Sequence, residues 1–198
     1  MNEIKSKKRA HLQLNLMLLI TVIPIAAAYI AYFTGWGVPT TTVNNGALLT
    51  PAKNVQDWLE FASGELPDYQ SNKQWHLFVP VKDCDEQCDA LLYLTRQVHI
   101  RLAQKSDRIE RYMVNLSGAE GEKLYERLKP AHPKMKLITL DYNHWKAWLS
   151  ETNAPDIEQK AFYVLVDQVG FAMMHYTEEQ DGNALLKDIK RVLKYSPD

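Results

Sequence analysis

The two cysteines of this 198-residue chain, Cys84 and Cys88, are the residues whose type and spacing point most directly to chemistry. They bound the segment C-D-E-Q-C at 84–88, which follows directly on the apolar run 76–81. On a helix that begins near Asp83, cysteines four residues apart lie on one face, one turn apart. Two uses fit this arrangement. A pair of soft thiolates can bind Cu(I) or Zn(II), and a reversible disulfide can form at a helix N-terminus, whose dipole favours the thiolate.

The elements around the cysteines predict an α/β fold. Apolar runs indicate strands, the segments between them have helical spacing, and a turn with Gly170 joins the last two strands into a hairpin. The expected strands are 75–81, 109–116, 135–140, 161–166 and 171–176, and the expected helices are 84–104, 120–128, 143–149 and 185–193. Right-handed crossovers make the first three strands parallel, and the hairpin completes a mixed sheet flanked by helices. This is the thioredoxin-like plan.

The segment before this domain predicts less regular structure. Residues 47–51 indicate a short edge strand, and 55–63 a short helical or irregular piece that turns Trp58 and Phe61 inward. Residues 65–73 are polar and are expected to form a loop.

The N-terminus predicts a membrane anchor. An apolar run at 12–33 follows a basic start, and about 20 helical residues cross a hydrocarbon core. The expected parts are a cytoplasmic basic tail 1–11, a transmembrane anchor 12–33, a linker and N-terminal extension 34–73 and a thioredoxin-like domain 74–198. By the positive-inside rule, the C-terminal domain of this single-pass protein faces the periplasm from a bacterial inner membrane.

A cleaved signal peptide is the alternative to this anchor. Cleavage would follow the small residues 26–28, but the apolar run continues through 29–33. Tyr32 and Trp36 also fall where an aromatic belt is expected. These features favour the uncleaved anchor.

Charge and cysteine spacing limit the function further. The net charge of −1 gives no reason to expect a nucleic-acid partner. Two cysteines in an oxidising compartment could form one structural disulfide, but such bridges usually close longer loops. The carboxylates of Asp83, Asp85, Glu86 and Asp89 raise a thiol pKa and attract cations. This surround favours a functional pair that binds a cation or docks to a basic partner, over fast nucleophilic exchange.

Topology selects two histidines as further site residues. The helix N-terminus with Cys84 lies at the carboxyl edge of the parallel strands. His144 follows the third strand and His175 ends the hairpin, so both are candidates there for a third metal ligand or a proton carrier. Alternatively, His144 is a surface residue at the start of a helix, and His175 is a strand histidine whose polar atoms are satisfied by its neighbours. His76 begins its strand at the opposite edge, and His99 lies about 22 Å along the helix, so both are set aside.

A strand that leads into a cysteine pair, on a thioredoxin-like plan behind one anchor, resembles the Sco/SenC family. These are membrane-anchored copper chaperones for the CuA centre of cytochrome c oxidase, and their motif is also C-x-x-x-C. The pattern Gly-Trp...Thr-x-Asn-x-Gly-x-Leu-x-x-Pro at 35–51, followed by Trp-His-Leu at 75–77, is similar to small anchored proteins associated with cytochrome oxidase assembly in proteobacteria. The resemblance transfers only Cys84 and Cys88 as site residues.

The chain also departs from that family. Sco proteins pair their cysteines with a histidine just before the strand that opens the hairpin, whereas 156–161 contains no histidine here. Thioredoxins place a cis-proline at the same point, and Pro155 lies further upstream.

The leading hypothesis is therefore a periplasm-facing factor that assists cytochrome c oxidase assembly. Cys84 and Cys88 would bind and deliver copper, or set the redox state of a partner's cysteines. The expected partners are the inner membrane and the CuA subunit of the oxidase or other assembly factors. The alternatives are a general thiol-disulfide oxidoreductase and a non-catalytic interaction protein on the same fold.

Overall fold

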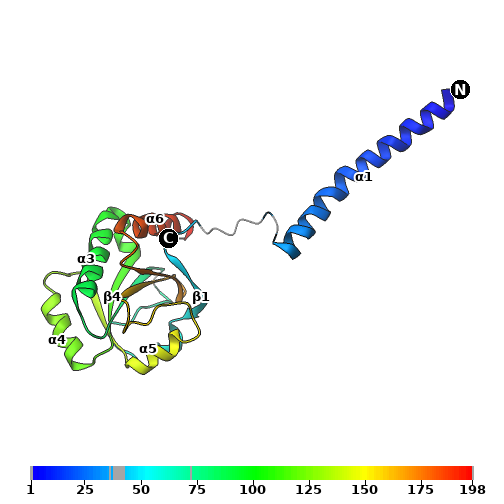
Figure 1. Ribbon diagram of the computed structural model, residues 1–198. Helices are drawn as coiled ribbons and strands as arrows, with labels where there is room; N and C mark the ends of the chain where they lie inside the picture. Colours follow the sequence, from blue (N-terminus) through cyan, green and yellow to red (C-terminus); the bar gives the residue numbers. More distant parts are fainter. Residues whose placement is uncertain (1, 36, 38–42, 72, 198) are drawn as a thin grey trace. The chain divides into compact units, whose positions relative to one another are not determined.

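The computed structural model in Figure 1 describes residues 2–35, 37, 43–71 and 73–197, with side chains from Gln13 onward. The chain forms two compact units, Met1–Val43 and Asn44–Asp198. Trp36, predicted to belong to an aromatic belt, and residues 38–42 of the predicted linker lie outside the described residues.

The first unit contains one long helix, α1 (Asn2–Thr34). Its part Gln13–Thr34 has a mean hydropathy of 2.3 and is long and apolar enough to cross a membrane. The hydroxyl groups of Thr21 and Thr34 donate hydrogen bonds to carbonyl oxygens one turn earlier in the helix. Polar groups that are paired in this way are tolerated in hydrocarbon. The prediction of one N-terminal apolar helix is confirmed.

The second unit is built on a seven-stranded mixed sheet of order β1-β7-β6-β3-β4-β5-β2. Its strands are β1 (Ala47–Asn54), β2 (Ser63–Gly64), β3 (Trp75–Val81), β4 (Ile109–Asn115), β5 (Met135–Thr139), β6 (Phe162–Val166) and β7 (Phe171–Thr177). Strands β3, β4 and β5 are parallel, and every other pairing is antiparallel. The predicted thioredoxin-like sheet is confirmed.

Helices cover both faces of this sheet (Figure 1). They are α2 (Gln56–Leu59), α3 (Glu86–Arg101), the 3-10 helix η1 (Ala103–Arg108), α4 (Ala119–Leu128), α5 (Tyr142–Leu149) and α6 (Gly182–Tyr195). Apolar side chains of α3, α4 and α6 pack with Leu77 and Val79 of β3 on one face. Those of α2 and α5 pack with Phe78 on the other. All seven residues of β3 are buried, as a strand covered on both faces requires.

Two of the four predicted helices differ from the structure by two residues or more at each end. The helix expected at 84–104 is α3, which begins at Glu86 and is followed by η1. The last helix begins at Gly182, before the predicted residue 185, because the Asp181 carboxylate accepts a hydrogen bond from Ala184 N at 2.8 Å. An N-cap of this kind satisfies a backbone donor that has no partner within the helix.

The N-terminal extension belongs to the same sheet. The predicted edge strand at 47–51 is confirmed and continues to Asn54, whereas β2 was not predicted. Trp58 is buried as expected, against the rings of Trp145 and Trp148 at 6.2 and 5.9 Å. The prediction for Phe61 was wrong, since its side chain is 53% exposed and stacks on His144. Helix α2 is a single turn, so the chain has already left the buried face at Phe61.

A buried carboxylate fastens the start of this unit to α6. Asp188 accepts hydrogen bonds from the backbone N–H groups of Asn45 and Gly46 at 2.8 and 2.9 Å. It also accepts from the Asn45 amide at 2.8 Å and from the Tyr176 hydroxyl at 3.1 Å. Gly46 is required here because an added Cβ would lie 2.4 Å from the Tyr176 ring. The chain therefore enters the sheet at one defined point.

Replacing Asp188 with asparagine tests this attachment. In either orientation, the new NH₂ group faces a donor that the carboxylate now accepts from, so D188N should lower the free energy of unfolding by about 2–4 kcal/mol. Urea unfolding of the full chain in detergent, followed by tryptophan fluorescence, measures this change. The control E120Q removes only the exposed ion pair with Lys123 and should cost less than about 1 kcal/mol. Equal losses in the two variants would contradict the assignment.

Candidate functional site

The structure brings Cys84 and Cys88 together in a disulfide, with their Cα atoms 5.1 Å apart. Cys84 is partly exposed in the turn after β3, and Cys88 is buried in the first turn of α3. The expectation that both cysteines lie on the helix was wrong. Asp85 is the N-cap, and its side chain accepts a hydrogen bond from Cys88 N at 3.0 Å, so the helix begins after Cys84.

The ends of β3 and β4 position Cys84. The backbone N–H of Leu116 donates to Val81 O at 2.8 Å, and the Ser117 hydroxyl donates to Lys82 O at 2.7 Å. Gly121 lets α4 approach closely at this edge, because an added Cβ would lie 1.8 Å from the Asn115 side-chain oxygen. The turn that carries Cys84 is therefore held against the start of α4.

Two hollows flank the disulfide, one beside each cysteine. The hollow beside Cys84 has a volume of about 290 Å³ and is also lined by Lys123 and Arg127 of α4. The hollow beside Cys88 has a volume of about 70 Å³ and is also lined by residues 157–161. The latter segment contains Glu158, Gln159 and Lys160, so it carries neither the histidine of Sco proteins nor the cis-proline of thioredoxins.

The charges at this edge are more balanced than the sequence indicated. Lys82 forms an ion pair with Glu158 and lies over the Tyr142 ring, 4.2 Å from its centroid. The hydrogen bond between Lys82 and Glu158 raises the pKa of the lysine and lowers that of the glutamate. Lys123 and Arg127 of α4 also line the Cys84 hollow. Sequence reasoning missed these two residues, because only the packing of α4 brings them near the cysteine.

Neither candidate histidine joins the cysteines in the structure. His144 lies on α5, 3.7 Å from the Asp141 carboxylate, on the sheet face opposite α3. His175 pairs with Val164 across β6 and β7, and cross-strand partners share a face, so it lies on that opposite face too. Among the described side chains, no group of three or more His, Cys, Asp or Glu residues could hold a metal ion. The expectation of a third ligand from either histidine is corrected accordingly.

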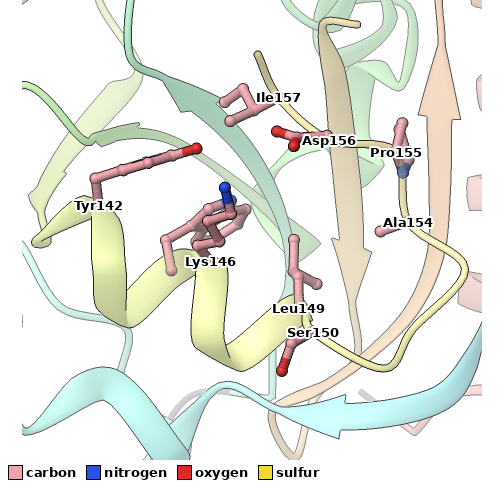
Figure 2. A pocket seen from close by; sticks show the side chains of 9 residues that line it. Tyr142, Lys146, Leu149, Ser150, Ala154, Pro155, Asp156 and Ile157 are labelled. Atoms are coloured by element: carbon pink, nitrogen blue, oxygen red, sulfur yellow. The ribbon is translucent and has the colours of Figure 1, made fainter. Parts of the chain in front are cut away.

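A groove lies next to the Cys88 hollow (Figure 2). It has a volume of about 200 Å³ and lies between α5 and residues 154–157. Figure 2 shows the charged ends of Lys146 and Asp156 pointing toward one another across it. Ile157 lines both this groove and the Cys88 hollow, so the two are neighbours.

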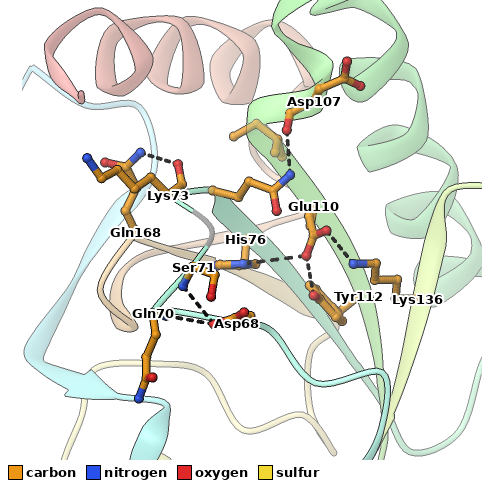
Figure 3. Close-up of polar contacts among 12 residues, drawn as sticks. Asp68, Gln70, Ser71, Lys73, His76, Asp107, Glu110, Tyr112, Lys136 and Gln168 are labelled. Carbon is orange, nitrogen blue, oxygen red and sulfur yellow. Dashed lines mark hydrogen bonds and ion pairs between the residues drawn. The ribbon is translucent and has the colours of Figure 1, made fainter. Parts of the chain in front are cut away.

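A buried histidine lies at the start of β3, at the end of the parallel strands opposite the cysteines (Figure 3). His76 is fully buried, and neither ring nitrogen has a hydrogen-bond partner among the described residues. Its Nε2 lies 3.8 Å from the Glu110 carboxylate, which accepts hydrogen bonds from Tyr112 and Lys136. The Tyr69 ring packs edge-on against the imidazole at 4.8 Å. Burial lowers the pKa of His76 from 6.5 to about 4, although Glu110 opposes this shift.

This burial predicts that stability rises with pH between about 4 and 6.5. Below pH 6.5 the unfolded chain binds a proton at His76, and the folded protein binds it only near pH 4, so acid favours unfolding. The gap between the two pKa values corresponds to at most about 3 kcal/mol. Urea unfolding at several pH values should show that the free energy of unfolding rises less steeply with pH in H76F than in the wild type. Some slope should remain, because burial also lowers the pKa of His99, His132 and His175.

The control H144A removes an exposed histidine and should keep the wild-type slope. A slope in H76F as steep as that of the wild type would show that His76 does not cause this dependence.

The cap at Asp85 gives a second prediction for the site. D85A removes the acceptor of the Cys88 N–H bond, so the free energy of unfolding should fall by about 1 kcal/mol. The same loss should shift the equilibrium constant between the disulfide and the open dithiol by up to about fivefold toward the dithiol, as measured in a glutathione buffer. Asp83 is exposed and does not cap α3, so D83A is the matched control. Equal effects of D85A and D83A would refute the role of the cap.

Solved structures with a similar fold include two Sco proteins. ScoI of Arabidopsis thaliana with copper bound has a TM-score of 0.52 and 12% identity, over 78% of this chain and 100% of that chain. Apo Sco1 of Thermus thermophilus has a TM-score of 0.52 and 12% identity, over 78% of this chain and 99% of that one. The expected likeness to Sco proteins is confirmed at the level of the fold.

A third solved structure with a similar fold is not named as a Sco protein. A DsbF homologue from Corynebacterium diphtheriae has a TM-score of 0.52 and 13% identity, over 79% of this chain and 95% of that chain. No curated protein matches the sequence. The family model described as transmembrane-like, thioredoxin-like, C-terminal domain matches residues 75–196. Because this match spans more than half of the sequence, the chain belongs to that transmembrane-like, thioredoxin-like family.

Proposed function

We propose that this protein is a membrane-anchored, periplasm-facing factor for cytochrome c oxidase assembly that binds and delivers copper through Cys84 and Cys88. The observation that carries the proposal is the position of this pair. The two sulfur atoms lie together at the carboxyl edge of the parallel strands, with Cys84 partly exposed and open to a hollow. A protein partner can therefore reach Cys84 without unfolding the domain.

The chemistry of the pair suits Cu(I) as a cargo. Reduction of the disulfide by a thiol reductant breaks the S–S bond with two electrons and two protons and leaves two thiols. Loss of their protons gives two soft thiolates, which are the ligands that Cu(I) prefers. The exposed carboxylates of Asp83, Asp85 and Glu86 favour a cation at this edge. With only two protein ligands, the ion stays open to a ligand from the receiving protein.

Indirect support comes from the fold and the N-terminus. ScoI of Arabidopsis thaliana, which has this fold, was solved with copper bound. The basic residues at positions 5, 7, 8 and 9 precede the apolar part of α1 and favour an outward-facing C-terminal domain. The CuA subunit of the oxidase or another assembly factor would be the partner.

Thiol redox is the second candidate for the same pair, and the composition of the Cys84 hollow favours it. Lys123 and Arg127 line that hollow; Lys123 is paired there with Glu120, so the guanidinium of Arg127 is the charge that favours the thiolate that attacks disulfides. In this role the pair would reduce or oxidise the cysteines of a partner, acting on oxidase subunits or on broader substrates.

Anaerobic Cu(I) titration of the reduced full chain in detergent, against a competing chelator, tests the proposal. We expect one Cu(I) per chain, and C84S/C88S should lose this binding because serine supplies no soft ligand. The variants H144A and H175A should bind as the wild type does, since neither residue reaches the pair.

Copper delivery by these cysteines would be contradicted if the wild type bound Cu(I) no better than C84S/C88S, and reduction of a disulfide substrate would then decide whether the pair has a redox role. If H144A or H175A weakened binding as strongly as loss of the cysteines, the site with two protein ligands would be wrong and that histidine would be a third ligand.

A further inference from the structure

The exposed side of α6 is basic. The four basic residues of this helix are spaced three and four residues apart, and all are exposed: Lys187, Lys190, Arg191 and Lys194. Residues at this spacing share one side of a helix, and we call these four the basic face of α6. Asp188, the one acidic residue of α6, is buried. The basic face is therefore positively charged, although the whole chain has a net charge of −1.

Two acidic side chains offset part of this positive charge. The Asp188 carboxylate lies 3.8 Å from the Arg191 guanidinium. The pKa of Asp181, the N-cap, is lowered mainly by the hydrogen bond from Ala184 N, and Lys187 is the smallest cause of this shift. Both contacts therefore concern Lys187 and Arg191 and leave the other two lysines of the basic face unchanged.

Those two lysines are less well neutralised than the lysines of α4. Lys190 and Lys194 form no ion pair with another residue that the structure describes. Along α4, in contrast, Lys123 and Lys129 each form an ion pair with a glutamate three residues earlier. Like charges three and four residues apart destabilise a helix, and negative charge outside the domain would relieve this repulsion on α6. The basic face therefore indicates a negatively charged partner.

The attachment of the chain to α6 indicates which partner this is. Asp188, in the middle of α6, accepts hydrogen bonds from the backbone N–H groups of Asn45 and Gly46 at 2.8 and 2.9 Å. Residues 35–44 join this point to the end of the apolar helix, and a connection of this length spans at most about 40 Å. A tether of this length gives the basic face an effective concentration at a membrane surface on the order of millimolar. Weak attraction to lipid headgroups is then sufficient for contact.

The end of α6 adds an aromatic ring to the basic face. Tyr195 is 77% exposed, and the Lys194 ammonium lies 5.3 Å from the centroid of its ring. Tyrosine is enriched at membrane–water interfaces. The next residue, Ser196, accepts a hydrogen bond from the indole of Trp75 at the start of β3, whereas the cysteines follow the other end of that strand, about 20 Å away. Contact of this end of α6 with a membrane therefore leaves the cysteine pair open to a partner.

We propose that the basic face of α6 binds the anionic phospholipid headgroups of the membrane that α1 enters. Charge complementarity supplies the attraction, and each lysine contributes about fivefold to the ratio of bound to free domain. The contact determines which side of the domain is turned toward the membrane. This inference goes beyond the proposed function, since it requires a membrane-inserted α1 but neither copper nor a reactive thiol.

Paramagnetic relaxation in lipid nanodiscs tests the contact. The deuterated, ¹⁵N-labelled full chain, with its disulfide closed, is inserted into discs of phosphatidylcholine, either alone or with phosphatidylglycerol at about three to one. Each disc carries a gadolinium chelate on a lipid headgroup. The amide relaxation enhancement in α6 should be about threefold larger in the anionic discs, whereas that in α5, on the other face of the sheet, should not rise. NaCl at about 0.5 M should remove the difference by screening.

Charge variants test whether the lysines of the basic face cause this effect. K187E/K190E should lower the ratio of bound to free domain at least about 25-fold, so that α6 relaxes in anionic discs as it does in neutral ones. K187R/K190R keeps the charge and should behave as the wild type does. The matched control K129E/K146E changes the net charge equally at two exposed lysines outside α6 and should keep the enhancement.

Three results would overturn the proposal. They are an α6 enhancement that is equal in neutral and anionic discs, an unchanged enhancement in K187E/K190E, and an equal loss in K129E/K146E. If the basic face bound an acidic protein instead of lipid, the enhancement in α6 would not depend on lipid charge, which also overturns the proposal. The comparison of lipids and salt uses the wild type, so it decides the question even if a variant misfolds. Because the disulfide stays closed and no copper is added, a failure of copper binding would leave this test unaffected.

Discussion

Burial of β3 on both faces is the constraint on which the rest of the domain depends. Its side chains alternate between two cores, so α3 and α6 must cover one face while α2 and α5 cover the other. The strand can leave this buried layer only at its carboxyl end, and the next residues are those of the Cys84 turn. The cysteine pair lies where the fold returns the chain to solvent.

The same two-layer arrangement explains the composition of the site. Cys88 belongs to the core on the α3 face, whereas His144 and His175 belong to the opposite side of the sheet. The sheet therefore separates them from the pair. A two-sulfur site that a partner completes is consistent with this separation, and it suits a protein that gives up its cargo or exchanges a disulfide rather than retaining a bound ion.

The sequence predicted the fold well because its strands are long apolar runs and its helices have regular spacing. It predicted the site less well. Asp83 and Asp85 are both acceptable helix caps, so the start of α3 and the position of Cys84 could not be decided from residue types. The face of His175 could not be decided either, because a register shift at Leu165/Val166 interrupts the alternation between β6 and β7. The basic side of the Cys84 hollow depends on helix packing that no local pattern reveals.

Copper delivery and thiol redox both require that Cys84 and Cys88 form a reversible pair on a domain that does not need their bond to fold. Urea unfolding of the full chain in its oxidised and reduced forms, with alkylation to verify each state, tests this most directly. We predict that each form unfolds in one cooperative transition. The free energies of unfolding of the two forms should differ by no more than about 2 kcal/mol, since so short a loop adds little chain constraint. A reduced form without a cooperative transition would show that the disulfide is a structural bridge, which a reversible pair excludes.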